Sequence, residues 1–524
     1  MKTRLLMGLL AVAVIAFGLA GPLNAKGLFD NIKGALKGGG QEQDKTQLDA
    51  FKSAIGLDEP CGGDGAATLS NARVEQGLGT VEEAQLGAYL NAIAGKLLAA
   101  SPRPHCRISV YVTPHDSTEA VSLADGGILI TLGFLRNLKN EDEVAALLAH
   151  ELSHILLNHH ASDSFVDTQD QFLKGMDTAN MAGSMFLGAV DPNLAAGLDT
   201  ASAVGSAVHG VSEGLIAPAW TREQEDEADL LGTDLAAAAG YNPRGMAAIM
   251  EVIKAHEAGS AEVDAERDKL RQQRLQGVAL QTATGTNPQS TISIIGSVAK
   301  IVGAAAESAS QNKKEHRSAE EREKRINEYI RKHHGEARRR SFAAEPWQAS
   351  LSKGSSGVMF EHFRAASEAR RLVYTGGDLA QAQSLAQSSL AGDFADDPYP
   401  RLAYAEVRLK QGDQNEAAEV LRAALQQPDA PWQLHRSLAD LQLKAGDIKG
   451  AVATVASADR AFGEPLGIAP YAIKVYKAAG DQKMVNVYLD RCNSAGKRQH
   501  LEVCLAAAGQ TKEQYQRGKL TRGG

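Results

Sequence analysis

Two histidines and a glutamate in HELSH, residues 150–154, have the spacing of a metal-dependent hydrolase. Side chains four positions apart share one face of a helix, so the His150 and His154 imidazoles can bind one ion. Glu151, beside them, can act as the general base for a metal-activated water. The alternative is a buried helix in which these histidines are incidental. The apolar run at 145–149 fits a helix buried at a domain centre.

A third ligand is expected in EDEAD, residues 225–229. A catalytic zinc site usually has three protein ligands and an open position for water. Glu225 would supply the carboxylate, and Asp229, four residues later, would accept a hydrogen bond from a ligand imidazole. The competing interpretation is that these acids form the first turn of a helix capped by Thr221. Two imidazoles with one carboxylate favour one zinc ion per chain.

The elements that must position these residues are mostly helices. Hydrophobic periodicity predicts helices at 81–100, 221–238 and 242–258, and short strands at 107–112 and 128–131. The helix that carries HELSH should begin after Asn140, a favourable N-cap that precedes three acidic residues. If the strand at 128–131 lies at a sheet edge, it would align an extended peptide by backbone hydrogen bonds.

Beyond about residue 355 the sequence becomes repetitive. Gly-Asp recurs at 377–378, 412–413, 446–447 and 480–481, at spacings of 34 or 35 residues. This is the period of the tetratricopeptide repeat, a helix–turn–helix unit. The sequence therefore predicts about four repeats and a final helix near 498–508. A groove for protein partners is the functional interpretation, and oligomer packing is the alternative.

The stretches AALLAHELSHILLNHH, residues 145–160, and EQEDEADLLG, residues 223–232, together resemble the gluzincin metallopeptidases. This is the family of the CAAX prenyl protease and the HtpX heat-shock protease. The resemblance implies a zinc endopeptidase in which the ligands and the general base are those already assigned: His150, His154, Glu225 and Glu151. It also implies that Asp229 lies beside the ligands.

The family also has a His-Pro-x4-Arg element after its active-site helices. Its best match here is His316 with Arg322, although Arg317 stands at the position of the proline. The resemblance implies a His-Arg pair at the cleft, and an exposed histidine in a charged helix is the alternative. His159 and His160 are interpreted as surface residues or as neighbours of the ligands.

The first 25 residues have the pattern of an export signal. Lys2 and Arg4 precede a long apolar stretch, and Ala25 ends a plausible cleavage site. An uncleaved membrane anchor is the alternative, and no later stretch reaches the ~20 apolar residues of a membrane-spanning helix. With this signal and the repeats, the chain resembles periplasmic members of the family. That resemblance implies clients that are unfolded or misassembled proteins, and the outer-membrane assembly machinery as a partner of the repeats. Membrane contact would then be peripheral.

Charge and cysteine content narrow the classes further. The net charge of −8 does not favour nucleic acid as a partner. Four cysteines permit two disulfides in an oxidising compartment, and pairing between nearest neighbours in sequence predicts Cys61–Cys106 and Cys492–Cys504 among three connectivities.

The expected fold class is mainly α: an α+β zincin-like metallopeptidase domain with a small sheet, then a tetratricopeptide α-solenoid. The expected segments are a signal peptide at 1–25, a flexible segment at 26–70, the metallopeptidase domain at 71–345 with an insertion at about 259–315, the repeats and final helix at 355–510, and a tail at 511–524. Residues 171–217 would be loosely packed helices over the site, or a surface for lipid or clients.

The leading function is an exported zinc endopeptidase of outer-membrane quality control. A non-enzymatic scaffold or chaperone with a gated or vestigial metal site is the alternative. A peptidase that acts on cell-wall peptides would use the same zinc chemistry.

Overall fold

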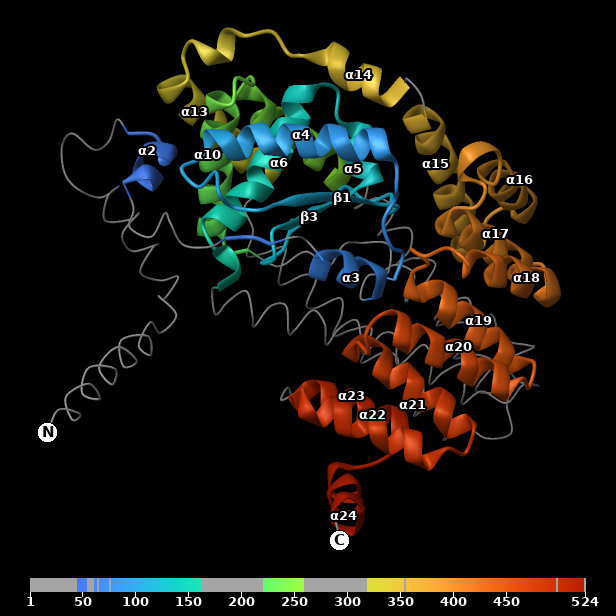
Figure 1. The fold of residues 1–524 in the computed structure, drawn as a ribbon. Coiled ribbons are helices and arrows are strands. Elements are labelled where there is room, and N and C mark those ends of the chain that lie inside the picture. The colour runs from blue at the N-terminus through green and yellow to red at the C-terminus, as the bar shows by residue number, and fades with distance from the viewer. Residues whose placement is uncertain are drawn as a thin grey trace, which may run out of the picture.

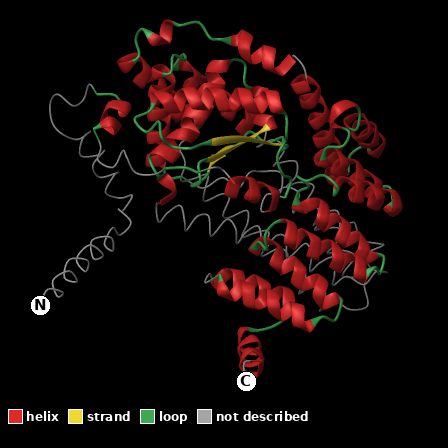
Figure 2. Ribbon diagram, viewed as in Figure 1, coloured by secondary structure: helices red, strands yellow, loops and turns green. Residues whose placement is uncertain are grey.

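The computed structural model describes residues 45–53, 61–63, 66–74, 77–161, 220–258, 318–352, 355–495 and 498–522. The predicted signal peptide, the segments 171–217 and 259–315, and His316 lie outside these residues. Among the helices that are described, none is long and apolar enough to cross a membrane. The protein is mainly helical with one small sheet, as expected from the sequence (Figure 2).

The sheet has three strands in the order β1-β3-β2: β1 (Ser109–Thr113), β2 (Ala120–Ser122) and β3 (Gly127–Thr131). β3 is buried along its whole length and pairs in parallel with β1 and antiparallel with β2. Residues 128–131 could align a peptide only from the edge of the sheet. Because β3 is the central strand, that expectation is wrong. The short β2, which periodicity did not predict, is an edge strand of this sheet.

Three helices pack together beside the sheet and form the centre of the N-terminal half (Figure 1). These are α4 (Ala84–Ala100), α6 (Glu141–Leu156) and α10 (Arg222–Ala238). The Asn140 side chain caps α6 as predicted, accepting a hydrogen bond from the Glu143 amide, and Thr221 caps α10. Every residue of α6 after its first is buried, so this helix carries its polar residues into the domain interior.

Shorter elements surround this centre. They are α2 (Gln47–Lys52), α3 (Ala66–Val74), α5 (Leu132–Asn137), η2 (His159–Ala161), a helix at 244–258, α13 (Ala319–His333), η3 (Ala337–Arg339) and α14 (Ala344–Ser352). α13 packs against α10, and α14 packs against α6 and against the first helix of the C-terminal half.

The C-terminal half is a curved row of helix pairs (Figure 1). The pairs are α15 (Ser355–Thr375) with α16 (Leu379–Ser389), α17 (Pro398–Lys410) with α18 (Gln414–Ala424), α19 (Trp432–Lys444) with α20 (Ile448–Ala461), and α21 (Ala469–Ala478) with α22 (Gln482–Ser494). Two 3₁₀ turns and two final helices complete it: η4 (Gly392–Phe394), η5 (Leu466–Ile468), α23 (Arg498–Ala508) and α24 (Lys512–Arg522).

Each recurrent Gly-Asp dipeptide lies between the two helices of a pair. Its aspartate caps the second helix, as Asp413 does by accepting a hydrogen bond from the Glu416 amide. Gly412 has φ +87°, a backbone conformation that glycine adopts at little cost. The small residue five positions after the glycine is fully buried in three pairs, for example Ala417, so the two helices can approach closely.

Hydrogen bonds tie the two halves together. Glu83 caps α4 by accepting from the Leu86 amide, and the same carboxylate accepts from the Ser355 and Ser356 hydroxyls at the start of α15, at 2.6 and 2.9 Å. α14, which packs against α15, is itself anchored to the N-terminal half because the Trp347 indole donates to the Leu138 carbonyl at 2.9 Å. Buried apolar residues of the N-terminal half continue without a break into the first helix pairs.

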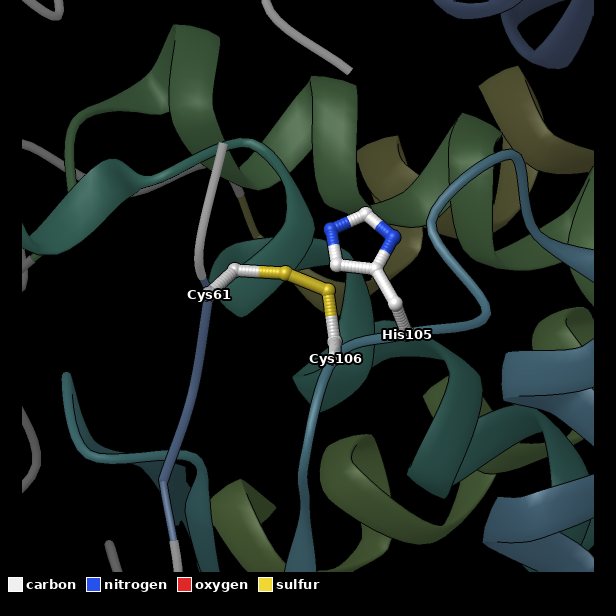
Figure 3. A group of neighbouring side chains, drawn as sticks. All are labelled: Cys61, His105 and Cys106. Carbon is white, nitrogen blue, oxygen red and sulfur yellow. A yellow bond between two sulfur atoms is a disulfide. The ribbon is translucent and has the colours of Figure 1, made fainter. Parts of the chain in front are cut away.

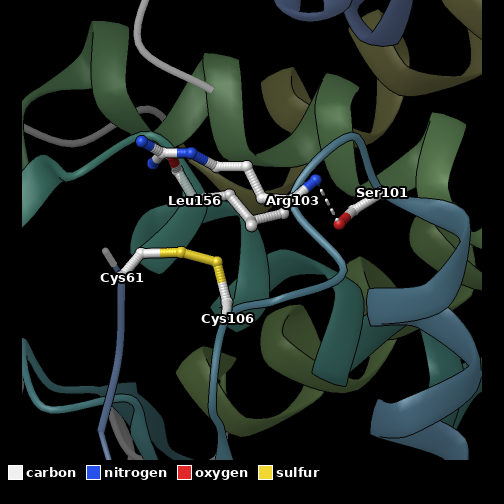
Figure 4. Close-up of a disulfide and its surroundings, with 5 residues drawn as sticks. All are labelled: Cys61, Ser101, Arg103, Cys106 and Leu156. Atoms are coloured by element: carbon white, nitrogen blue, oxygen red, sulfur yellow. Dashed lines mark hydrogen bonds between the residues drawn. A yellow bond between two sulfur atoms is a disulfide. The ribbon is translucent and has the colours of Figure 1, made fainter. Parts of the chain in front are cut away.

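Both predicted disulfides are present. Cys61 is bonded to Cys106, with His105 nearby (Figure 3), and Cys492 on α22 is bonded to Cys504 on α23. Close to the first bond, the Arg103 guanidinium donates to the carbonyl of Leu156 at 3.0 Å, so the loop before β1 contacts the end of α6 (Figure 4).

Asp397 gives the C-terminal half a pH-dependent stability. Burial, with the charge of Asp429 second, raises the pKa of Asp397 to about 7. The folded chain thus holds this proton more tightly than the unfolded chain, so the group's contribution to the free energy of unfolding falls as pH rises from about 4 to about 7. We expect Asp397→Asn to raise Tm at pH 8 by on the order of 2 °C, with the gain shrinking towards pH 4. Thermal melts across this range measure it.

The exposed Asp393 is the matched control, since Asp393→Asn removes the same charge from the same region. Equal shifts in the two variants would contradict a specific role for Asp397 and indicate a net-charge effect.

Candidate metal centre

Three predicted ligands meet between α6 and α10. His150, His154 and Glu225 are buried, and one potential ligand atom from each lies within 4.8 Å of the others. The two imidazole Nε2 atoms are 3.2 Å apart, and the Glu225 Oε2 atom is 3.5 Å from His150 Nε2. Two imidazoles and a carboxylate that converge on one point can hold a metal ion. HELSH and EDEAD are therefore placed as the sequence predicted.

A glycine allows the two helices to come this close. A Cβ atom at Gly232 of α10 would lie 3.0 Å from the backbone nitrogen of His150 and 2.7 Å from Met246 Cε. Any larger residue would push α10 away from α6 at the level of the ligands.

Asp229 lies against the Nδ1 side of the His150 ring. Its Oδ1 atom lies 3.0 Å from His150 Nδ1, which leaves the Nε2 lone pair facing the ligand cluster. Burial alone would raise the pKa of Asp229, but the Arg322 guanidinium outweighs burial and holds that pKa below its ordinary value. Burial likewise opposes the charged form of His150, and Asp229 overcomes it and raises the pKa of the imidazole.

Arg322 lies at the centre of the site. From α13 it donates two hydrogen bonds to Asp229, at 2.8 and 2.7 Å, and its Nη2 atom is 3.0 Å from Glu225 Oε2. The guanidinium thus links the ligand helix α10 to α13. The other half of the expected pair, His316, lies outside the described residues, so that pair stays a prediction.

Glu151 is buried beside the ligands and is not one of the three converging residues. Its neighbour is Ser122 at the end of β2, and burial raises the pKa of its carboxyl group. In the described part of the chain, the Glu151 Oε2 atom has no hydrogen-bond partner. A buried carboxylate oxygen with unused hydrogen-bonding capacity suits a group that must accept a proton from water.

His159 and His160 are also buried, so the interpretation as surface residues is wrong. The chain turns after α6 at Asn158, which has φ +54°, and η2 then brings His159 back to the site. His159 Nδ1 lies 2.8 Å from His154 Nδ1, and His159 Nε2 lies 3.5 Å from Glu227 Oε2.

The sequence reasoning missed Trp220. Its ring stacks on the His154 imidazole with centroids 4.3 Å apart and an interplanar angle of 18°. Its place in the sequence is the one feature that could have pointed to this role, because Trp220 directly precedes Thr221, which caps the ligand helix. Aromatic packing of this kind restricts the rotamer of a ligand before any ion binds.

A second group has the residue types of a metal site but not its chemistry. Cys61, His105 and Cys106 lie close enough to share an ion (Figure 3). The two sulfur atoms are bonded to each other, so neither is a thiolate, the form of cysteine that binds metals.

Comparison with known proteins identifies similarity to metallopeptidases. The model of Peptidase family M48 matches residues 84–333. The beta-barrel assembly-enhancing protease of Yersinia pestis is 26% identical over 161 residues, which cover 31% of each chain. The Escherichia coli K12 protein of that name is 23% identical over 33% of this chain and 34% of its own. Metalloprotease YcaL of the same strain is 24% identical over 53% of this chain and 97% of its own. The chain thus aligns with about a third of the length of the assembly-enhancing proteases.

His159 should set the tautomer of His154. Two Nδ1 atoms 2.8 Å apart form a hydrogen bond if one carries the proton, and a proton on His154 Nδ1 leaves its Nε2 free for an ion. We expect His159→Phe to weaken Zn²⁺ binding by roughly 10–100-fold. Competition against a chromogenic chelator measures this change.

His160→Phe is the matched control, because it removes another buried imidazole that bonds the Ser122 carbonyl instead of a ligand. Equal loss of binding in the two variants would indicate general damage to the fold, and melting curves of both proteins would reveal it.

Proposed function

We propose that this chain is a zinc-dependent endopeptidase that hydrolyses peptide bonds of unfolded or misassembled proteins, since residues 84–333 match the model of Peptidase family M48. The observation that carries the proposal is the convergence of His150, His154 and Glu225 beside a buried Glu151.

Zinc fits this donor set best, since imidazole and a single carboxylate recur in catalytic zinc sites. His150, His154 and Glu225 would hold the ion, which when bound lowers the pKa of water and polarises a peptide carbonyl. The carboxylate of Glu151 takes a proton from the attacking water and passes it to the leaving amine. Asp229 keeps the His150 Nδ1 proton in place, and Arg322 keeps Asp229 ionised.

The edge strand β2 is the best candidate for aligning a substrate. β1 and β2 are both edge strands of the described sheet, and β2 is the one whose Ser122 lies beside Glu151. An extended peptide that pairs with an edge strand is positioned by main-chain hydrogen bonds. Main-chain hydrogen bonds do not depend on the side chains of the peptide, so substrates of many sequences would bind next to Glu151, the proposed base.

The four helix pairs act as tetratricopeptide repeats that recruit clients. Support comes from the 34- or 35-residue spacing, the aspartate caps and the buried small residues of each pair. The proposed boundaries are the peptidase domain at 71–345, with its insertion at about 259–315, and the repeats with the final helix at 355–510. The relatives named for enhancing beta-barrel assembly support a role in the quality control of such proteins. We extend this to the outer membrane, with its assembly machinery as the partner of the repeats.

The proposed location is the periplasm, reached by cleavage of residues 1–25, with peripheral contact to the outer membrane. Two disulfides fit an oxidising compartment.

Glu151→Gln tests the proposal directly. The variant keeps all three ligands, so we expect it to bind one zinc ion per chain and to cleave unfolded casein at least about 100-fold more slowly than the parent. Elemental analysis measures the zinc, and gel or fluorescence assays measure the cleavage. A chelator should abolish cleavage by the parent protein.

Glu223→Gln is the matched control, since Glu223 is an exposed acid on the same helix as Glu225 and should be dispensable. Zinc without cleavage in the parent would favour a gated site or a non-enzymatic scaffold. Absence of zinc would refute the metal centre.

A further inference from the structure

A cavity of about 300 Å³ lies on the far part of α13, away from the ligands. Its lining consists of Arg244, Asn327, Ile330, Arg331, Arg338 and Arg339. Three segments supply these residues: the start of the helix at 244–258, one face of α13, and η3.

The cavity is unusual in its charge. Four of its lining residues are arginines and none is acidic, in a chain whose net charge is −8. Among the described residues, no carboxylate forms an ion pair with any of these four guanidinium groups. Arginines nearer the start of α13 behave differently, because Arg322 pairs with Asp229 and Arg325 pairs with Asp226. The exposed arginines Arg364 and Arg371 in the C-terminal half also have carboxylate partners.

Four like charges around one cavity repel one another, and an anion between them would relieve that repulsion. A planar guanidinium presents paired N–H donors that match the oxygens of a phosphate group. The Asn327 amide adds a neutral donor, and the buried Ile330 gives one apolar surface. A volume of about 300 Å³ is at the lower limit of small-molecule sites and exceeds what a bare ion needs.

The pocket is separate from the metal centre. Arg322 and Arg331 are nine residues apart on α13, which corresponds to about 13 Å along the helix axis. None of the lining residues is a proposed ligand, the general base, or a contact of either.

From the cavity and its four arginines, which have no carboxylate partner in the described part of the chain, we propose that this pocket binds the phosphate group of an anionic ligand. The ligand is a small phosphomonoester or the headgroup of an anionic phospholipid, which share the same chemistry. The proposal does not depend on peptidase activity.

The test compares the full chain with the double variant Arg331→Gln/Arg339→Gln. Both arginines are exposed and have no ion pair with any described residue, so the variant should melt at or above the parent temperature. The control is Arg364→Gln/Arg371→Gln, which removes the same net charge from arginines outside the pocket. Soluble probes are inorganic phosphate and glycerol 3-phosphate in calorimetric titrations. Lipid probes are phosphatidylglycerol and phosphatidylcholine vesicles in sedimentation assays.

We expect saturable binding of at least one phosphate probe to the parent and the control, and binding at least tenfold weaker in the pocket variant. Saturation by glycerol 3-phosphate would identify a soluble ligand. Sedimentation with phosphatidylglycerol alone, lost in the pocket variant, would identify a lipid headgroup. Absence of binding by every probe, or equal loss in the control and the pocket variant, would overturn the proposal.

Discussion

The buried carboxylate of Asp229 is the contact on which the metal centre depends. It joins three helices, because it orients His150 on α6, belongs to α10 and receives both hydrogen bonds of Arg322 from α13. A buried charge is costly unless it is paired and hydrogen-bonded, and here both conditions hold. Asp234, one turn further along α10, has a similar role, since it accepts hydrogen bonds from the Leu48 amide and the Tyr329 hydroxyl. α10 therefore fixes α6, α13 and α2 through two carboxylates.

The site is rigid for a second reason, which is packing. α6 is buried on all sides, and Gly232 lets α10 approach it without a spacer. Trp220 then covers His154 from one side while His159 contacts its Nδ1 atom. The ligands thus have few alternative rotamers, and an ion can bind without large rearrangement.

Whether the sequence predicted a feature of this site depended on how far apart along the chain the interacting residues lie. Helical period places His150 and His154 on one face of α6, and the cap Asn140 marked where that helix begins. Glu225 was predicted from a different signal, the EDEAD motif downstream of HELSH. The period of 34 or 35 residues predicted the helix pairs because each pair forms from one continuous stretch of sequence. Contacts between distant segments that carry no motif and no cysteine pair were not predicted.

Tertiary contacts account for most of what the sequence reasoning missed. Trp220 reaches His154 across a long separation in sequence, and His159 returns to the site through a left-handed turn at Asn158. Strand order was equally hidden, because the three residues of β2 are too few for a periodic signal and they make β3 the central strand. Glu83 adds a last consequence, because the carboxylate that caps α4 also accepts the hydroxyl groups of Ser355 and Ser356. The halves are therefore not freely interchangeable modules, because a transplanted repeat array would have to bring its own pair of hydroxyl groups to Glu83.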